Sequence, residues 1–211
     1  MVDSISSLYP VFTVGANDDE FDDGSFSGWT AVNVGTQVPT ITETNNVASV
    51  LHPGGGGAAY LWAYMRSYAM QTNDYIETGF KHNGTGASFQ RIGLIMADGN
   101  TWNAGSQALF SVSYAQAFVN FSSYTNYNAD GGGSTFTQTP MPQGCGMTFL
   151  RFKYEGANHF RCYISCDGIS WIDISGQMTR TLTPTYIGFY VTPYAGGDPF
   201  LASIYYFKKG P

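Results

Sequence analysis

The sequence has little charge. Only 11% of its 211 residues are Asp, Glu, Lys or Arg, well below the roughly 25% of ordinary soluble domains. The nine basic residues are scattered, and the one adjacent pair is Lys208-Lys209. The net charge is −6, and the clustered Lys and Arg that phosphate binding needs are missing. The composition therefore argues against a nucleic-acid partner.

Long apolar runs and a leader peptide are missing as well. No run approaches the ~20 apolar residues needed to span a membrane, so we expect no membrane insertion. The opening stretch MVDSISSLYPVFTVG has neither the basic start nor the small-residue cleavage site of a secretory signal. We therefore expect a protein made in the cytoplasm without a signal peptide.

Cysteine is scarce and odd in number. Cys145, Cys162 and Cys166 cannot all pair within one chain, which fits a reducing compartment. An extended strand separates residues four apart by about 13 Å, beyond disulfide reach. We predict three reduced thiols, with Cys162 and Cys166 buried on an apolar strand face. A zinc site with His159 is the alternative, but buried thiols are favoured because His159 belongs to the other face of that strand.

Hydrophobic residues recur with a period of two, and no segment holds a helical stripe over three turns. The stretches at 150–154, 160–166 and 186–192 each alternate apolar and polar residues. Breaks rich in Gly, Asn and Pro separate roughly ten or more such strands, which predicts a sandwich or barrel of antiparallel sheets. We predict one domain, residues 17–211, preceded by an N-terminal arm, residues 1–16.

Three stretches carry a resemblance to a known family: DDEFDDGSFSGWTAVN (18–33), LRFKYEGANHFRCYISCDGISWIDIS (150–175) and YIGFYVTPYAGGDPFLASIYYFKKG (186–210). In this order they resemble concanavalin A-like lectin and glucanase jelly-roll domains, of the kind found in bacteriophage virion proteins. The resemblance implies an all-β, two-sheet antiparallel jelly roll over nearly the whole chain. It also implies that Trp29 and Trp171 pack the core.

Catalytic members of that family carry paired carboxylates as Glu-x-Asp-x-x-Glu on one strand. Glycoside hydrolysis needs two carboxylates that face each other across a cleft. The acidic stretch at 18–23 fits neither that spacing nor the strand period, and Glu43, Glu77 and Glu155 are isolated in the sequence. We therefore expect no glycoside hydrolase activity.

The acidic stretch has two other interpretations. Four aspartates could supply the hard oxygen ligands that calcium takes, namely Asp18, Asp19, Asp22 and Asp23. Some relatives bind calcium between this segment and an Asp on the final strand, but here that position holds Tyr205. In the favoured interpretation Phe21 and Trp29 fill the core, while the carboxylates stay solvated or accept hydrogen bonds from backbone N–H groups.

Aromatic residues make up 16% of the chain. Alternate residues in a strand share one face, and aromatic platforms beside polar groups suit sugars. The candidate carbohydrate-binding residues are Tyr60, Trp62, Tyr64, Arg66, Trp102, Tyr124 and Tyr127. The competing interpretation is that about half of these rings simply belong to the core, because one face of a sheet must be buried.

Two functional hypotheses follow. The first is a non-enzymatic, lectin-like structural protein of a bacteriophage particle (capsid decoration, tail or receptor-binding component) that binds host-surface glycans. Its apolar arm, residues 1–16, would dock onto other virion proteins or copies of the same chain. The second is a carbohydrate-binding module of, or related to, a polysaccharide-degrading enzyme. The missing signal peptide and the missing carboxylate triplet favour the first.

Overall fold

The computed structural model describes residues 15, 18–34, 38–53, 61–83, 91–99, 108–114, 118–124, 134–140, 145, 147–192 and 199–211, with the backbone alone for the strands within 108–140. The predicted N-terminal arm lies almost entirely outside these residues. Within them the secondary structure is strand, turn and loop without helix. None of the described segments is thus a helix of the length and apolarity needed to cross a membrane.

The strands alternate with short turns along the chain. They are β1 (Thr30–Val34), β2 (Thr40–Glu43), β3 (Ala48–His52), β4 (Leu61–Ser67), β5 (Tyr75–Asn83), β6 (Arg91–Ala97), β7 (Ala108–Tyr114), β8 (Phe118–Tyr124), β9 (Ser134–Pro140), β10 (Thr148–Gly156), β11 (His159–Ser165), β12 (Ile172–Asp173), β13 (Met178–Thr179), β14 (Tyr186–Thr192) and β15 (Phe200–Gly210).

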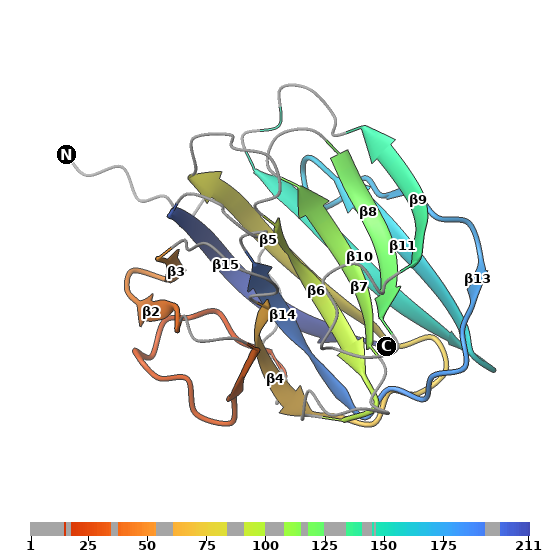
Figure 1. Ribbon diagram of the computed structural model, residues 1–211, viewed down its shortest axis with the longest axis horizontal. Coiled ribbons are helices and arrows are strands. Elements are labelled where there is room, and N and C mark those ends of the chain that lie inside the picture. The colour runs from red at the N-terminus through yellow and green to blue at the C-terminus, as the bar shows by residue number, and fades with distance from the viewer. Residues whose placement is uncertain are drawn as a thin grey trace.

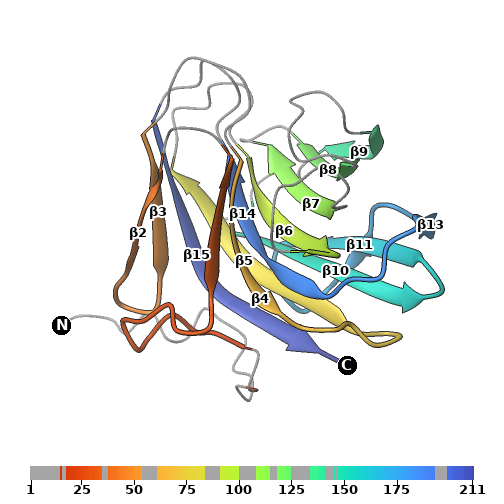
Figure 2. The ribbon, with the colours of Figure 1, turned by 60° about the horizontal axis from the view of Figure 1, so that its bottom comes forward.

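These strands form two sheets that stack face to face (Figures 1 and 2). The seven-stranded sheet has the order β1-β4-β14-β6-β7-β8-β9. The eight-stranded sheet has the order β12-β11-β10-β5-β15-β3-β2, with β13 also paired to β11. The pairings between these strands are antiparallel. The predicted two-sheet antiparallel sandwich is confirmed.

The period of two in the sequence places apolar side chains between the sheets. On β14, Ile187, Phe189 and Val191 are fully buried and belong to the core. On β11 and β10 the matching residues include Cys162 and Phe152, also fully buried. Burying a side chain of this size stabilises the fold by about 1.5–3 kcal/mol. The outward residues between them are partly exposed, as the alternating burial pattern of both strands shows.

Two aromatic residues of the opening segment close one end of this core. Phe21 is fully buried and meets Phe189 edge to face, with ring centroids 5.9 Å apart. Trp29 packs edge to face on Phe189 at 5.1 Å and on Phe207 at 5.0 Å. Such aromatic pairs contribute about 0.5–1.5 kcal/mol beyond their buried area. The prediction that Phe21 and Trp29 fill the core is confirmed.

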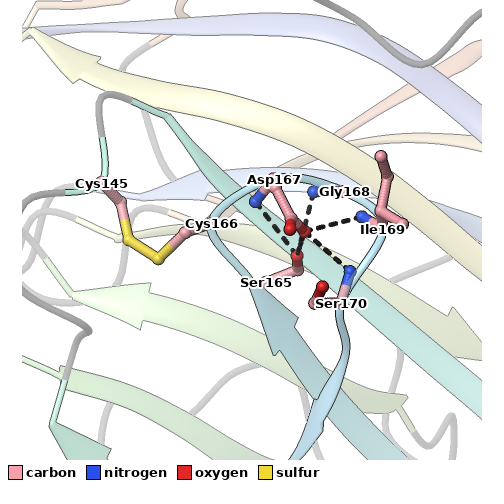
Figure 3. The surroundings of a disulfide bond; sticks show 7 residues. All are labelled: Cys145, Ser165, Cys166, Asp167, Gly168, Ile169 and Ser170. Carbon is pink, nitrogen blue, oxygen red and sulfur yellow. Dashed lines mark hydrogen bonds between the residues drawn. A yellow bond between two sulfur atoms is a disulfide. The ribbon is translucent and has the colours of Figure 1, made fainter.

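The prediction of three reduced cysteines is wrong. A disulfide joins Cys145 to Cys166, with the Cα atoms 5.2 Å apart (Figure 3). The β10–β11 register sets Phe149 opposite Ser165, so the segment before β10 meets the residue after β11. Cys162 and Cys166 are too far apart along one strand to pair, whereas Cys145 comes from a different segment of the chain. Cys166 is exposed because β11 ends at Ser165, whereas Cys162 is buried in the core as predicted.

The turn after the disulfide explains the motif Ser-x-Asp-Gly-x-Ser at residues 165–170. Asp167 Oδ1 accepts hydrogen bonds from Ser165 Oγ, Ile169 N and Ser170 N at 2.7–2.8 Å. Ser165 Oγ in turn accepts from Asp167 N and Gly168 N. Figure 3 shows these bonds converging on the turn. The backbone donors of Ser170 and Ile169 hold the pKa of Asp167 well below its usual range.

Candidate functional site

The acidic opening segment is bound to the last strand. Asp18 Oδ1 accepts a hydrogen bond from Lys209 N at 2.7 Å, and Asp18 Oδ2 accepts one from Gly15 N at 2.7 Å. The backbones of Asp19 and Phe207 exchange two hydrogen bonds at 2.7 and 2.8 Å. Charge-assisted bonds of this kind are stronger than neutral ones. These carboxylates therefore hold the start of the domain against β15.

Asp19 also anchors the cation of β4. Its Oδ2 accepts from Trp29 Nε1 at 2.5 Å and from Arg66 Nη2 at 3.2 Å, and its Oδ1 accepts from Phe21 N. The Arg66 guanidinium lies 4.0 Å from the Trp29 ring centroid, a cation–π contact. Burial lowers the pKa of Arg66, and the negative charges of Asp19 and Asp18 oppose that shift. The cluster of Asp19, Trp29 and Arg66 therefore stabilises the end of the core where it lies, and its charged groups are paired with each other.

The other carboxylates of the segment lie nearer to solvent. Asp23 Oδ1 accepts from Ser25 N, which closes a turn, and Asp22 is exposed. Glu43 on β2 accepts a hydrogen bond from Gly24 N at 2.6 Å. Burial raises the pKa of Glu43, and the nearby charges of Asp19 and Asp23 raise it further. The predicted use of carboxylates as acceptors for backbone N–H groups is confirmed for Asp18, Asp19 and Asp23.

A calcium ion fits this arrangement poorly. Both carboxylate oxygens of Asp18 and of Asp19 already accept N–H donors. The Arg66 guanidinium stands 3.2 Å from Asp19, where its positive charge opposes a second cation. Among the described residues, no group of three or more His, Cys, Asp or Glu is arranged to hold a metal.

The predicted aromatic face of β4 turns toward the core where it is described. Tyr64 stacks on Phe189, with ring centroids 5.8 Å apart and planes at 4°, and it packs against the core cluster. Arg66 is held by Asp19 and Trp29 as described above. The register sets Arg66 opposite Ile187 and Tyr64 opposite Phe189. This placement supports the competing interpretation, that the residues on this face of β4 pack the core, for Tyr64 and Arg66.

The remaining predicted sugar-binding residues are placed only in part. Tyr60, Trp102 and Tyr127 lie outside the described residues. Trp62 pairs with Val191 through the backbone of β4 and β14. Tyr124 is the last residue of β8, and its backbone pairs with Ala108 on β7. Ala108 in turn pairs with Ala97 on β6. Their part in binding a glycan stays a prediction.

The seven-stranded sheet is almost free of charged residues. Its seven strands contain no Asp or Glu, and their basic residues are Arg66 and Arg91. Its outer face, away from the other sheet, carries Met65, Ile95 and Tyr190 at its centre, each at most 2% exposed. Toward β9, the strand sequences contain Ser, Thr, Asn and Gln among apolar residues. This sheet can offer hydroxyl, amide and aromatic contacts, but no carboxylate.

The eight-stranded sheet carries a buried ion pair that the sequence analysis missed. Glu77 on β5 accepts from Arg151 Nε at 2.9 Å and Nη2 at 2.6 Å, and from Tyr206 Oη at 2.7 Å. Burial, followed by the charge of Glu77, raises the pKa of Tyr206. Only the sheet order brings β5, β10 and β15 side by side, so no local signal in the sequence joins these residues.

Two rings flank the guanidinium of this pair. Arg151 lies 4.1 Å from the Trp171 ring centroid and 4.4 Å from that of Tyr75. Trp171 therefore covers the outer face of the sheet, and it is partly exposed. The expectation that Trp171 packs the core is wrong, because the ring precedes β12, which pairs with β11, and lies over Arg151. The Trp of the Ser-Trp motif at 170–171 therefore packs against Arg151 of the Glu77–Arg151 ion pair.

Glu155 and Asp173 meet in space although they are distant in the sequence. Both bind Arg161, with Glu155 Oε1 3.0 Å from Nε and Asp173 Oδ2 2.5 Å from Nη1. Burial acts to raise the pKa of each carboxyl. For Glu155 the hydrogen bonds of Gln177 and Arg161 outweigh it, and for Asp173 that of Arg161 does, so both pKa values are lowered. Arg161 therefore stabilises both carboxylates in the ionised form.

These features define the class of fold: the sandwich is that of the concanavalin A-like lectins. No protein-family model matches the chain, and no curated protein matches it. Solved structures do match it over most of its length, at sequence identities that establish the fold alone.

Three of these structures illustrate the likeness. The VIP36 exoplasmic/lumenal domain in its Ca²⁺/Man3GlcNAc-bound form has a TM-score of 0.61 at 13% identity, covering 91% of this chain and 87% of that one. A native glycosidic hydrolase has a TM-score of 0.60 at 15% identity, covering 91% and 93%. The CBM2 module of the evolved Dit of Lactobacillus casei BL23 phage J-1 has a TM-score of 0.55 at 12% identity, covering 91% and 93%.

Proposed function

We propose that the protein is a non-enzymatic, lectin-like structural component of a bacteriophage particle that binds glycans on the host surface. The observation that carries the proposal is the absence of Asp and Glu from all seven strands of the seven-stranded sheet. A glycosidase needs two carboxylates on its substrate-binding surface, whereas a sugar-binding surface needs hydroxyl, amide and aromatic groups.

The neighbouring structures support both halves of the proposal. The VIP36 domain adopts this fold with Man3GlcNAc bound, so the sandwich is compatible with glycan binding. The phage J-1 module adopts it as part of a Dit protein, so it also serves in a phage. Fold alone does not assign a function. The charge distribution of this chain therefore supports binding rather than hydrolysis.

A second candidate function is a carbohydrate-binding module of, or related to, a polysaccharide-degrading enzyme. The likeness to a glycosidic hydrolase favours it. In that case the same surface would bind polysaccharide, and catalysis would belong to another part of the assembly. Both candidates predict glycan binding without turnover by this chain. Association with purified phage particles distinguishes them, because a virion component co-purifies with the particle.

Calcium is not required at the opening segment under this proposal. VIP36 structures exist in Ca²⁺-bound and metal-free forms, but here Arg66 occupies the neighbourhood of Asp19. Glycan binding by the full chain should therefore survive chelation by EDTA. Loss of binding in EDTA, restored by added calcium, would contradict this part of the proposal.

The experiment that tests the function uses the purified full-length protein on a glycan array and on intact host cells. We expect binding to at least one glycan class and no release of reducing sugar from a broad polysaccharide panel. Turnover that disappears when Glu155 or Glu77 is changed to Gln would overturn the non-enzymatic proposal. The Lys81→Gln variant serves as a control for general surface perturbation, because it removes an exposed charge of the same sheet and leaves every carboxylate in place.

A further inference from the structure

We infer that residues 169–172, the acceptor turn between β11 and β12, form a docking surface for the N-terminal arm of a second copy of the chain. This contact concerns how copies of the protein assemble, so it goes beyond the proposed function and does not depend on it. The structure describes every residue of the acceptor turn. The arm, up to residue 14, lies outside the described residues and contributes through its sequence alone.

The acceptor turn gathers exposed apolar side chains. Large hydrophobic side chains are exposed at four described positions, and two of these belong to the turn, Ile169 at 75% and Ile172 at 59%. Trp171 lies between them in the sequence and is partly exposed. Exposed apolar residues that gather in one place mark interaction sites, and Trp is enriched among the residues that dominate binding at interfaces. The turn therefore has the composition of a protein–protein contact.

The backbone of the acceptor turn is fixed before a partner binds. Asp167 Oδ1 accepts hydrogen bonds from Ile169 N at 2.8 Å and Ser170 N at 2.7 Å (Figure 3). The disulfide of Cys166 ties the residue before Asp167 to the segment that precedes β10. Trp171 packs on a guanidinium 4.1 Å from its ring centroid. A surface that is already ordered loses little entropy on binding, so the turn is well prepared to accept a flexible partner.

The strand beside the turn offers an open sheet edge. β12 is the last strand in the order of the eight-stranded sheet, and it pairs with β11 through Tyr163–Asp173 and Ile164–Ile172. None of the described strands pairs with its other side. Extended segments add to such edges through backbone hydrogen bonds, and their alternate side chains contact the neighbouring surface. The edge and its isoleucines therefore favour an extended, apolar partner.

The N-terminal arm has the sequence of such a partner. Its residues 11–14 are Val-Phe-Thr-Val, residue types that are enriched in strands. Ile5, Leu8 and Tyr9 add apolar side chains before them, and Asp3 is the one charged residue of the arm. Fully extended, fourteen residues span at most about 46–50 Å. The arm is therefore long enough to reach a neighbouring molecule and apolar enough to gain by being covered there.

The geometry favours an arm from a second copy over the chain's own arm. Asp18 binds Lys209 on β15, and the order β15-β5-β10-β11-β12 places the acceptor turn four strand spacings away, roughly 19 Å. The outer face between them carries Glu77, Arg151 and Lys153, which an apolar segment would desolvate in crossing. Figures 1 and 2 show the opening segment and β11 on opposite sides of the molecule. The contact is therefore head to tail, and such contacts build rings or open chains.

Two full-length variants test the contact by complementation. Phe12→Asp disables the arm, and Ile169→Asp disables the acceptor turn. Each variant alone should self-associate at least about tenfold more weakly than the unaltered protein in sedimentation velocity at roughly 1–100 μM. An equal mixture of the two should form a dimer, because the intact arm of Ile169→Asp meets the intact acceptor turn of Phe12→Asp. An arm that docks on its own chain gives no dimer in the mixture.

Leu51→Asp is the matched control. Leu51 is also an exposed apolar residue of the eight-stranded sheet, but it lies on β3 near the opposite edge, so this variant should self-associate like the unaltered protein. Circular dichroism checks the fold of each variant, and Ile172→Asp replaces Ile169→Asp if the latter unfolds. The inference is overturned by a monomeric unaltered protein over this range, by a mixture without dimer, or by equal weakening in Leu51→Asp. Glycan binding, measured on the same samples, bears on the proposed function alone.

Discussion

The strands of the seven-stranded sheet carry two charged side chains, Arg66 and Arg91, whereas those of the eight-stranded sheet carry ten. The latter residues are Glu43, Glu77, Lys81, Arg151, Lys153, Glu155, Arg161, Asp173, Lys208 and Lys209. Both sheets bury an apolar inner face. They differ on the outer face, where the eight-stranded sheet has charged residues held in pairs and the seven-stranded sheet has few charged residues.

The eight-stranded sheet tolerates charge by pairing it. Glu77 is 3% exposed and yet has three hydrogen bonds from Arg151 and Tyr206. The seven-stranded sheet carries only Arg66 and Arg91 on its strands, and the centre of its outer face is as well buried as the core. On the eight-stranded sheet, Glu77, Glu155 and Asp173 are held by arginine partners. The strand sequences of the seven-stranded sheet supply hydroxyl, amide and aromatic groups instead.

The largest expected effect comes from placing a charge on the uncharged sheet. Ile95 on β6 is fully buried, and an unpaired ammonium there carries a desolvation penalty of several kcal/mol. We expect Ile95→Lys to destabilise the protein by about 4 kcal/mol or more, measured by urea unfolding. Ile95→Met controls for shape and should cost less than about 1.5 kcal/mol. Thr42→Lys on the exposed edge of the eight-stranded sheet should stay within about 0.5 kcal/mol.

Removing a partner from the paired sheet should have the next largest effect. Glu77→Ala leaves the Arg151 guanidinium and the Tyr206 hydroxyl without their acceptor. We expect a loss of about 3 kcal/mol in the free energy of unfolding. Glu155→Ala, in the more exposed pair with Arg161, should cost less than about 1 kcal/mol. If Glu77→Ala and Glu155→Ala lowered the free energy of unfolding equally, burial would not determine how much each ion pair contributes to stability.

The disulfide lies where the chain passes from β9 in one sheet to β10 in the other. It spans 21 positions of sequence, and closing a loop of that length stabilises a fold by about 3 kcal/mol in the chain-entropy model. We expect Cys145→Ser, or dithiothreitol added to the unaltered protein, to lower the free energy of unfolding by about 2–3 kcal/mol. Thiol titration after unfolding should find one thiol without reductant, Cys162, and three with it. Three thiols in the non-reduced protein would exclude the pairing.

Acid should act on the eight-stranded sheet, because its strands hold the three histidines. Burial lowers the pKa of His52 to about 4, below the ~6.5 of an unfolded chain. The folded state therefore binds fewer protons between these values, and stability is full above pH 6.5 and falls as the pH drops toward 4. We expect a loss of about 2 kcal/mol between pH 7 and pH 5. In His52→Gln the free energy of unfolding should vary less between pH 7 and pH 5. If it varies as much as in the unaltered protein, groups other than His52 cause the pH dependence.

Much of this fold could be predicted from local patterns. The alternation in residues 150–154, 160–166 and 186–192 identified β10, β11 and β14, because burial of one face imposes a period of two. Phe21 and Trp29 were placed correctly because large aromatic side chains in an otherwise polar, turn-rich segment gain most by burial in the core. The role of Asp18 and Asp19 also followed, since short acidic side chains near turns accept backbone N–H donors.

Contacts that depend on sheet order could not be predicted. Glu77 lies 74 positions from Arg151 and 129 positions from Tyr206, and only the order β10-β5-β15 joins the three residues. Trp171 was assigned to the core because the family resemblance implies it, but the ring packs on the guanidinium of Arg151 instead. The β10–β11 register brings Cys145 and Cys166 together, and the spacing of the two cysteines along the chain does not reveal this pairing. Tyr64 was offered as a sugar platform because a period of two does not say which face points inward.

The bond between the opening segment and β15 has a mechanical consequence. Asp18 and Asp19 hold Lys209 and Phe207, and β15 is hydrogen-bonded along its length to β5 and β3. A pull on the chain before residue 18 would therefore load β15 along its axis, against many hydrogen bonds in parallel, rather than peeling an edge strand one bond at a time. If the arm tethers this domain to a particle, the sandwich should bear tension without opening. In a force spectroscopy experiment, pulling from residue 15 should give a higher rupture force than pulling from the edge strand β2.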